Sequence, residues 1–299
     1  MTVPRTIRLA HAKVNPFLRV LGRRDDGYHD IETLIVPIGL ADEIEIVEAD
    51  DLRLVIDGDH AGHVPVGEEN LAVRAARMLA LACGQHEAVE IRLTKRIPVA
   101  AGLGGGSADA AAALTMLAER WACPSEMVQE VAVRLGSDVP ALLLGGWTIA
   151  RGRGERLEPV PPQAGTWIVA PADFGISAAD AYRWWDEDGG TTGPDPAPFL
   201  DALRAGDFEA AGLLMHNDLE PGILRRYPDL EETRARLLAD GALGAVVTGS
   251  GPTVVALAHP SELAPDDSNV HFRIQSPASY PLDEGPSVRA RRSPAARRA

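Results

Sequence analysis

The sequence predicts an α+β protein of two domains that share a cleft. Runs of alternating apolar and polar residues, typical of strands, dominate the beginning of the chain, and helical patterns become frequent after them. A stretch rich in proline and glycine at 152–165 marks a boundary between the two domains. With 299 residues, of which 45% are hydrophobic, the chain is long enough to bury two modest cores.

The N-terminal part is expected to hold a meander of strands and then a group of helices. The stretch DEIEIVE at 42–48 alternates cleanly, as a strand with one buried face does. Asn70 is expected to cap a helix that ends before Gly84. The expected strands are 6–22, 31–40, 42–48, 52–56, 89–93 and 147–151, and the expected helices are 71–82, 107–121 and 125–135.

The C-terminal part is expected to be mostly helical, with a strand at 167–170 and a hairpin at 245–258 whose turn lies at 249–252. From His259 onward no apolar period persists, and arginines gather at the end of the chain. We therefore expect 259–299 to be a disordered tail, either aberrant or an extension, and the second domain to lack an edge element. One expected helix begins at Ser177, and three others span 197–205, 207–215 and 229–240.

Composition excludes several classes of protein. A formal net charge of -14 argues against binding to nucleic acid. The N-terminus has no apolar core of signal-peptide length, and no run of eighteen apolar residues occurs, so we expect a cytoplasmic protein without a membrane partner. Cys83 and Cys123 are too few and too isolated for a zinc site and are expected to be buried or inert thiols.

A glycine-rich loop is the strongest chemical signal in the chain. The segment PVAAGLGGGSADAAAAL at 98–114 leads from glycines through Ser107, which can cap a helix, into an alanine-rich helix. Free backbone N–H groups at such a helix start favour a phosphate site, although a tight strand-to-helix turn would look similar. The loop lacks the lysine of a Walker loop and the acidic residue of a dinucleotide-binding turn, so it belongs to neither class.

Lysine is rare in this chain. It occurs at positions 13 and 95, and every other residue among the 29 of Lys+Arg is arginine. The flexible ammonium of lysine and the planar guanidinium of arginine differ in reach and geometry. Lys13, in the first strand, and Lys95, just before the glycine loop, are therefore candidate site residues.

Three segments of this chain resemble motifs of the GHMP small-molecule kinases: the region around Lys13, the loop at 98–114, and TGSGPT at 248–253. Longer matches at 10–34, 68–76 and 134–143 resemble the branch that phosphorylates the 2-hydroxyl of 4-diphosphocytidyl-2-C-methyl-D-erythritol with ATP. The resemblance implies a ribosomal-protein-S5-like N-terminal domain at 1–160 and a ferredoxin-like α/β domain at 161–258. The active site would lie in the cleft between them.

The resemblance also implies catalytic roles. Asp138 would accept the proton of the substrate hydroxyl, and Lys13 beside it would keep that carboxylate ionised and offset charge on the transferring phosphoryl group. The alternative for Asp138 is a helix cap before Pro140.

ATP and Mg²⁺ are the implied cofactors. The resemblance places Asn70 and Lys95 near the adenine and ribose of ATP. Ser107, together with the ATP phosphates, would hold Mg²⁺, and Asp109 is a weaker candidate. The residues implied for the phosphates are Pro98, Gly102, Leu103, Gly104, Gly105, Gly106 and Ser107.

The acceptor side is implied by a second set of residues. Cytosine would stack between Tyr28 and Tyr182, and His29 would read its polar edge, although all three are also ordinary half-buried aromatics. The full set implied for the substrate is Asn15, Tyr28, His29, Tyr182, Thr248, Ser250 and Gly251.

Three alternatives remain open at this level. The chain could be another GHMP kinase acting on a mevalonate-type or homoserine-type alcohol, a nucleotide-binding protein inactivated by its unusual C-terminus, or a Rossmann-type dinucleotide binder. The expected partners are small molecules, and the expected assembly is a monomer or a weak homodimer.

Overall fold

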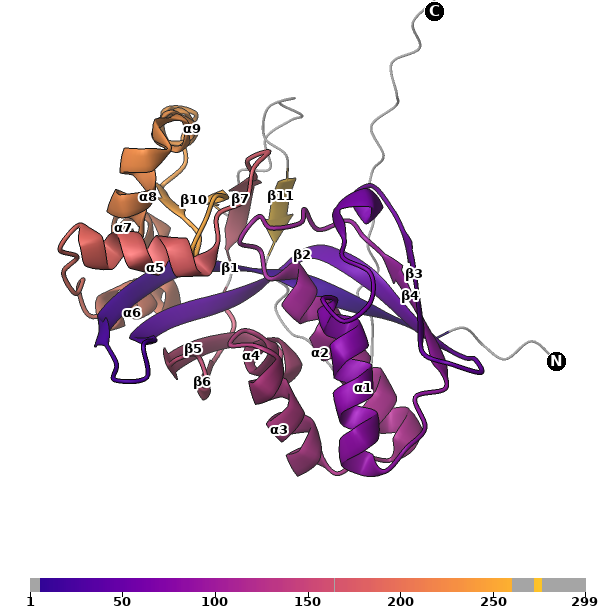
Figure 1. The fold of residues 1–299 in the computed structure, drawn as a ribbon. Helices are drawn as coiled ribbons and strands as arrows, with labels where there is room; N and C mark the ends of the chain where they lie inside the picture. The colour runs from indigo at the N-terminus through magenta and orange to yellow at the C-terminus, as the bar shows by residue number, and fades with distance from the viewer. Residues whose placement is uncertain (1–5, 164, 260–271, 276–299) are drawn as a thin grey trace, which may run out of the picture.

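The computed structural model describes residues 6–163, 165–259 and 272–275, and these form two sheets flanked by helices (Figure 1). A seven-stranded sheet has the order β3-β4-β2-β1-β8, with β5 paired to β2 and β6 paired to β5. Its strands are β1 (Ile7–Arg23), β2 (His29–Glu48), β3 (Arg53–Asp57), β4 (Val89–Thr94), β5 (Trp147–Gly152), β6 (Arg156–Val160) and β8 (His216–Asn217).

The long antiparallel hairpin of β1 and β2 is the frame of this sheet. The two strands that the sequence predicts at 31–40 and 42–48 are one continuous strand, because β2 pairs with β1, β4 and β5 along its length. Residues 156–160, expected to be loop, form β6. Their proline content is compatible with an edge strand, since a proline at an edge need not donate to a neighbour.

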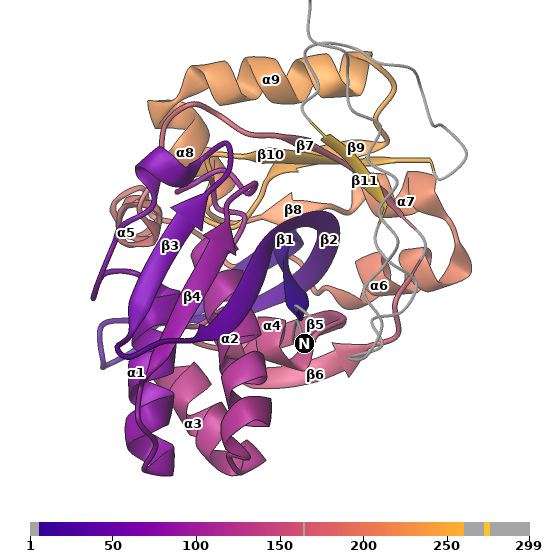
Figure 2. The same cartoon turned by 90° about the vertical axis from the view of Figure 1, so that its right-hand side faces the viewer.

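Four helices accompany the first sheet. They are α1 (Leu71–Cys83), α2 (Gly105–Trp121), α3 (Ser125–Leu135) and α4 (Val139–Leu144), and a short 3₁₀ turn spans Ala61–His63. Helix α2 packs on β1 and β2, and the other three pack against α2 (Figure 2). Asn70 caps α1 as predicted, because its side-chain oxygen accepts hydrogen bonds from two N–H groups of the first turn. The alanines of α2 are buried, and their small side chains let the helix approach its neighbours closely.

The two cysteines form a disulfide, which corrects the expectation of separate thiols. Cys83 ends α1, and Cys123 follows α2. Packing of α1 against α2 brings these ends together, with 5.9 Å between the two Cα atoms across a sequence separation of 40 residues. Two isolated cysteines gave no signal of this pairing, because it arises from the contact between helices.

The second sheet has the order β11-β7-β10-β9. Its strands are β7 (Thr166–Ala170), β9 (Gly244–Val247), β10 (Val254–Ala258) and β11 (Phe272–Gln275), and its helices are α5 (Ala178–Glu187), α6 (Ala197–Ala205), α7 (Phe208–Leu213), α8 (Glu220–Arg226) and α9 (Pro228–Ala239). The predicted hairpin is confirmed as β9 and β10.

The segment from 259 onward does contribute an edge strand, because β11 pairs with β7. The expectation that the second sheet lacks such an element is therefore wrong. The rest of the predicted tail lies outside the described residues.

One core crosses from the first sheet to the second. Strand β8, from the C-terminal part, pairs in parallel with β1. Phe17 stacks on Phe199 with ring centroids 5.8 Å apart, and Trp147 lies 6.3 Å from Trp167. The two parts are therefore packed together around the cleft. Among the described residues, no helix is long and apolar enough to cross a membrane.

Candidate active site

Lys13 lies at the centre of the site, on β1. Its ammonium donates hydrogen bonds to the Asn15 side-chain oxygen at 2.7 Å and to the Gly102 carbonyl at 2.9 Å. It also lies 3.5 Å from a carboxylate oxygen of Asp138. The side chain of Lys13 is 7% exposed and that of Asp138 is 33% exposed. A buried ammonium thus faces a carboxylate that is partly exposed.

Asp138 precedes α4, as the sequence suggests, but its side chain makes no capping hydrogen bond. The alternative interpretation, a helix cap, is therefore not what the structure shows. With its backbone in the helical region and its carboxylate beside Lys13, Asp138 is available for chemistry.

The glycine loop wraps around Lys13. Gly102 and Gly104 have φ values of 76° and 69°, which favour glycine over residues with a side chain. A Cβ on Gly104 would lie 2.9 Å from Cγ of Lys13, so the lysine stem packs directly on this glycine. Helix α2 begins at Gly105, two residues earlier than predicted, with Gly104 as its N-cap. Ser107 therefore lies inside the first turn and is not the cap.

The loop forms one wall of a cavity of about 320 Å³. Asn70, Lys95, Pro98 and all of 102–107 line this cavity, so the structure brings the predicted ATP-binding residues together. Asn70 itself is occupied: its oxygen caps α1, and its nitrogen donates to the Pro65 carbonyl at 3.1 Å. It shapes the cavity wall through these bonds.

Lys95 is held by two carboxylates. Its ammonium forms ion pairs with Asp42 and, at 2.8 Å, with Asp109, and its side chain is 3% exposed. The structure thus shows a buried tether, and the expected contact of Lys95 with adenine and ribose stays a prediction.

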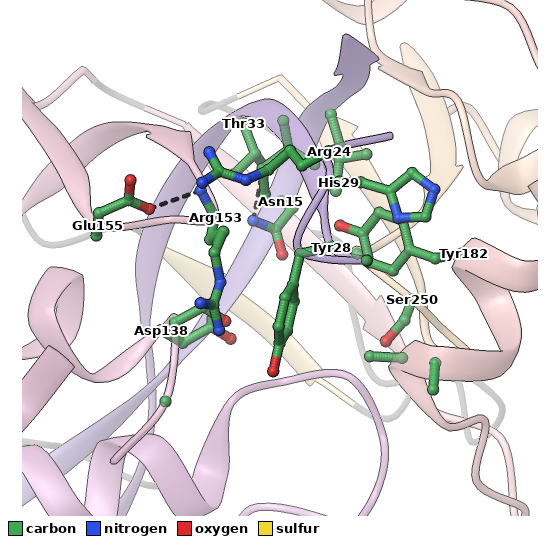
Figure 3. Close-up of a pocket in the computed structure, with 18 of the residues that line it drawn as sticks. Asn15, Arg24, Tyr28, His29, Thr33, Asp138, Arg153, Glu155, Tyr182 and Ser250 are labelled. Atoms are coloured by element: carbon green, nitrogen blue, oxygen red, sulfur yellow. Dashed lines mark hydrogen bonds between the residues drawn. The ribbon is translucent and has the colours of Figure 1, made fainter. Parts of the chain in front are cut away.

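Lys13 also lines a second cavity, of about 1000 Å³. Lys13 and Asp138 line it, together with the five predicted acceptor-side residues Asn15, Tyr28, His29, Tyr182 and Ser250 (Figure 3). In Figure 3, Asp138 lies to one side of Tyr28, and Tyr182 and Ser250 lie to the other. The aromatic and catalytic candidates therefore share one cavity.

Two predicted substrate residues support this cavity from behind. Thr248 is fully buried, and its hydroxyl accepts a hydrogen bond from the Asn15 backbone N–H at 2.6 Å. A Cβ on Gly102 would lie 2.5 Å from the carbonyl oxygen of Gly251, so these two backbones touch. Neither Thr248 nor Gly251 lines the second cavity. The third motif therefore holds β1 and the loop in place, and direct contact of these two residues with substrate stays a prediction.

The aromatic groups differ in detail from the predicted sandwich. His29 stacks on Tyr182 with ring centroids 4.9 Å apart, and its Nε2 lies 2.9 Å from a carboxylate oxygen of Asp186. The guanidinium of Arg153 lies 3.5 Å above the ring of Tyr28. One face of each tyrosine is thus already covered. Burial, and then the charge of Asp138, raises the pKa of Tyr182, so its phenol stays neutral.

Several site residues escaped the sequence analysis. Thr33 accepts a hydrogen bond from the Asn15 amide at 2.9 Å, and Asn217 donates to the carbonyls of Val247 and Gly249 at 2.6 and 2.8 Å. Arg153 stands between glycines, a pattern that marks a turn but no partner. These contacts join segments far apart in the sequence, so local patterns carry no signal of them.

Comparisons with known proteins point to one family. The family model of the GHMP kinases N terminal domain matches residues 70–146, and that of the GHMP kinases C terminal matches residues 199–269. A relative named 4-diphosphocytidyl-2-C-methyl-D-erythritol kinase, from Pelotomaculum thermopropionicum, is 45% identical over 83% of this chain and 88% of its own. A relative of the same name from Streptomyces avermitilis is 42% identical over 84% of this chain and 87% of its own.

Solved structures give the same result. A 4-(cytidine 5'-diphospho)-2C-methyl-D-erythritol kinase matches with a TM-score of 0.72 and 38% identity, over 85% of this chain and 90% of that one. The L. major mevalonate kinase, at 18% identity, shares the fold with a TM-score of 0.65 over 92% of this chain and 96% of that one. The chain therefore belongs to the GHMP kinase family, in the group of the 4-diphosphocytidyl-2-C-methyl-D-erythritol kinases.

Proposed function

We propose that this chain transfers the γ-phosphoryl group of ATP to the 2-hydroxyl of 4-diphosphocytidyl-2-C-methyl-D-erythritol, in the non-mevalonate route to isoprenoid precursors. The observation that carries the proposal is the position of the Lys13–Asp138 pair. Both residues line the larger cavity, and Lys13 also bonds to Gly102, which lines the smaller one. A phosphoryl group passing from one cavity to the other would meet this pair.

The smaller cavity is the proposed ATP site. The N–H groups at the start of α2 offer donors and the positive end of the helix dipole to the phosphates. Asn70 lines this cavity, on the wall where the adenine and ribose would rest.

Mg²⁺ would be held by the ATP phosphates together with the hydroxyl of Ser107. Ser107 lines the smaller cavity within the first turn of α2, and magnesium commonly binds through one or two protein oxygens and the substrate phosphates. In the described part of the chain, no group of three or more His, Cys, Asp or Glu side chains is placed to hold a metal ion. When bound, the ion supplies positive charge that offsets the charge of the phosphates.

The chemical step needs the attacking oxygen, the γ-phosphorus and the bridging oxygen of ATP to lie in line. The 2-hydroxyl oxygen attacks the γ-phosphorus, the bond from that phosphorus to the bridging oxygen breaks, and ADP leaves. The hydroxyl proton passes to the Asp138 carboxylate. Lys13 stabilises charge on both the carboxylate and the transferring group, because its ammonium is buried where electrostatic interactions are strong.

The larger cavity is the proposed acceptor site. Its volume of about 1000 Å³ suits a molecule with a nucleoside, a diphosphate and a sugar alcohol. Cytosine would lie between Tyr28 and Tyr182, on the faces that Arg153 and His29 leave open. Ser250, in the turn after β9, would face the diphosphate.

Acceptor profiling tests the proposal. ADP release is measured with the cytidylylated methylerythritol, with methylerythritol 4-phosphate, with mevalonate and with homoserine, each at equal concentration. We expect turnover with the cytidylylated acceptor alone, and the product should carry its new phosphate on the 2-hydroxyl by ³¹P NMR. Turnover with mevalonate or homoserine would support another GHMP kinase, and ATP binding without any turnover would support an inactive nucleotide-binding protein.

A further inference from the structure

Three charged side chains meet beneath the start of α2. Asp42 comes from β2, Lys95 follows β4 and Asp109 belongs to α2, and their exposed fractions are 0%, 3% and 2%. The Lys95 ammonium bonds to both carboxylates. Buried charges are costly unless they are paired, so this cluster fixes the relative positions of three elements.

The two carboxylates are not equivalent. The second oxygen of Asp42 accepts the backbone N–H groups of Arg96 and Ile97 at 2.6 and 2.8 Å. The second oxygen of Asp109 is buried without a hydrogen-bond partner among the described residues. Asp42, on β2, thus binds both Lys95 and the backbone that follows it. Asp109, on α2, binds Lys95 only within the described part of the chain.

The cluster touches the phosphate loop directly. A Cβ on Gly105 would lie 2.9 Å from the Lys95 ammonium nitrogen, so the charged end of Lys95 packs against the first residue of α2. Lys95 and Asp109 line the smaller cavity together with the loop. Any shift of Lys95 therefore moves the first turn of α2, whose free N–H groups form the anion site.

We propose that Asp109 is a positioning residue that holds the Lys95 ammonium against Gly105 and so keeps the N–H groups of the loop aimed at the phosphates of ATP. This inference rests on the proposed function, because it takes the smaller cavity as the ATP site. In this proposal Lys95 supports the phosphate loop through its contact with Gly105 and does not touch the adenine base. Loss of the Asp109 acceptor should therefore weaken binding of phosphates and leave binding of the nucleoside unchanged.

Calorimetric binding of ATP and of adenosine, without acceptor, tests this role in two variants. Asp109→Ala removes the acceptor but leaves the Lys95–Asp42 pair intact in an alanine-rich helix, so the chain should still fold. We expect its ATP affinity to fall about tenfold, the size of one lost charge-assisted hydrogen bond. Asp109→Asn keeps an oxygen for Lys95 and should retain most of the ATP affinity. Adenosine affinity should be unchanged in both. Glu119→Gln, on α2 but outside both cavities, is the control.

Each other outcome overturns the proposal in a recognisable way. Equal losses of ATP affinity in the Ala and Asn variants, or a gain in both, would show that the charge of Asp109 matters and not its bond to Lys95. An equal loss for adenosine and ATP would place Lys95 at the base or ribose. Unchanged ATP affinity in both variants, with lowered thermal stability, would leave a purely structural role. If the unmodified chain bound no ATP, the proposed function itself would fail.

Discussion

The contacts of Lys13 require a lysine, and not an arginine, at this position. Its stem lies on Gly104, and its ammonium fits among the Asn15 oxygen, the Gly102 carbonyl and the Asp138 carboxylate. A planar guanidinium is larger and directs its donors in a fork, so it cannot replace this compact charge without moving the loop. This geometry explains why an arginine-rich chain retains lysine here.

The Lys13→Arg and Lys13→Met variants test this argument. We expect both to lower kcat by at least about 100-fold, because electrostatic stabilisation of the transition state is lost or misplaced. Stopped-flow or steady-state ADP release measures the rate. A Lys13→Arg enzyme with nearly full activity would show that charge alone suffices at this position.

The acceptor cavity gives a second prediction at the residue scale. Tyr28→Leu removes a stacking surface but keeps an apolar side chain, so KM for the cytidylylated acceptor should rise about tenfold, in line with ~1–3 kcal/mol for stacking of one base. KM for ATP should not change, because Tyr28 lines the larger cavity and not the smaller one. Initial rates at varied concentrations of each substrate measure both constants. An equal rise in both KM values would indicate general disruption of the fold.

Sequence motifs predicted part of the lining of both cavities, but not Thr33 and Arg153 and not the bonds that hold the lining in place. The glycine loop and the lysines were visible because such residue types are unusual locally. Asp42 and Asn217 were missed, since Lys95 lies 53 residues from Asp42, and the carbonyls to which the Asn217 amide donates lie 30 and 32 residues away. The stacking of His29 on Tyr182 was missed for the same reason, because β2 and α5 meet only in the folded chain.

At the scale of elements, the start of α2 is tightly constrained at one of its glycines. Gly104 lies in the left-handed region and against Lys13, whereas Gly106 lies in the helix, where a Cβ would meet nothing closer than Leu71 at 3.7 Å. The fold therefore requires glycine at position 104, whereas position 106 has room for a Cβ.

The matched variants Gly104→Ala and Gly106→Ala test this difference. Gly104→Ala should lower the free energy of unfolding by at least about 1 kcal/mol, because alanine is strained at positive φ. Gly106→Ala should leave the free energy of unfolding unchanged or raise it, since alanine favours a helix. Urea unfolding followed by circular dichroism gives both values. Equal stabilities of the two variants would contradict the described start of the helix.

Elements with strong local signals were predicted well. The cap at Asn70, the helix start near Ser177 and the hairpin of β9 and β10 depend on neighbouring residues, and the structure confirms them. Strands β6 and β11 and helix α8 were missed, because edge pairing and packing decide them rather than local pattern. The disulfide between Cys83 and Cys123 likewise depends on contact between helices.

On the scale of the whole molecule, the cleft is held by a core that the two sheets share. Phe17, on β1, is 1% exposed and packs on Phe199 from α6. Because β8 also joins β1, the first sheet includes a strand from the C-terminal part. The two halves of the site should therefore unfold together.

Removal of one shared side chain tests this cooperativity. Phe17→Ala should lower the free energy of unfolding by about 3–5 kcal/mol, the cost of deleting a buried aromatic ring. The transition should remain single by circular dichroism and by tryptophan fluorescence. Leu81→Ala, at a position 84% exposed, is the control and should change little. Two separate transitions in the unmodified protein would show that the halves are independent.

The most direct test of the account is turnover by Asp138→Asn with ATP and the cytidylylated acceptor. The substitution keeps the shape of the side chain but removes the proton acceptor beside Lys13. We predict a fall in kcat of at least about 100-fold, the usual contribution of a general base, with KM for ATP unchanged. Asp50→Asn, at an exposed turn outside both cavities, should keep full activity. Turnover by Asp138→Asn within a few-fold of the unmodified chain would contradict the account.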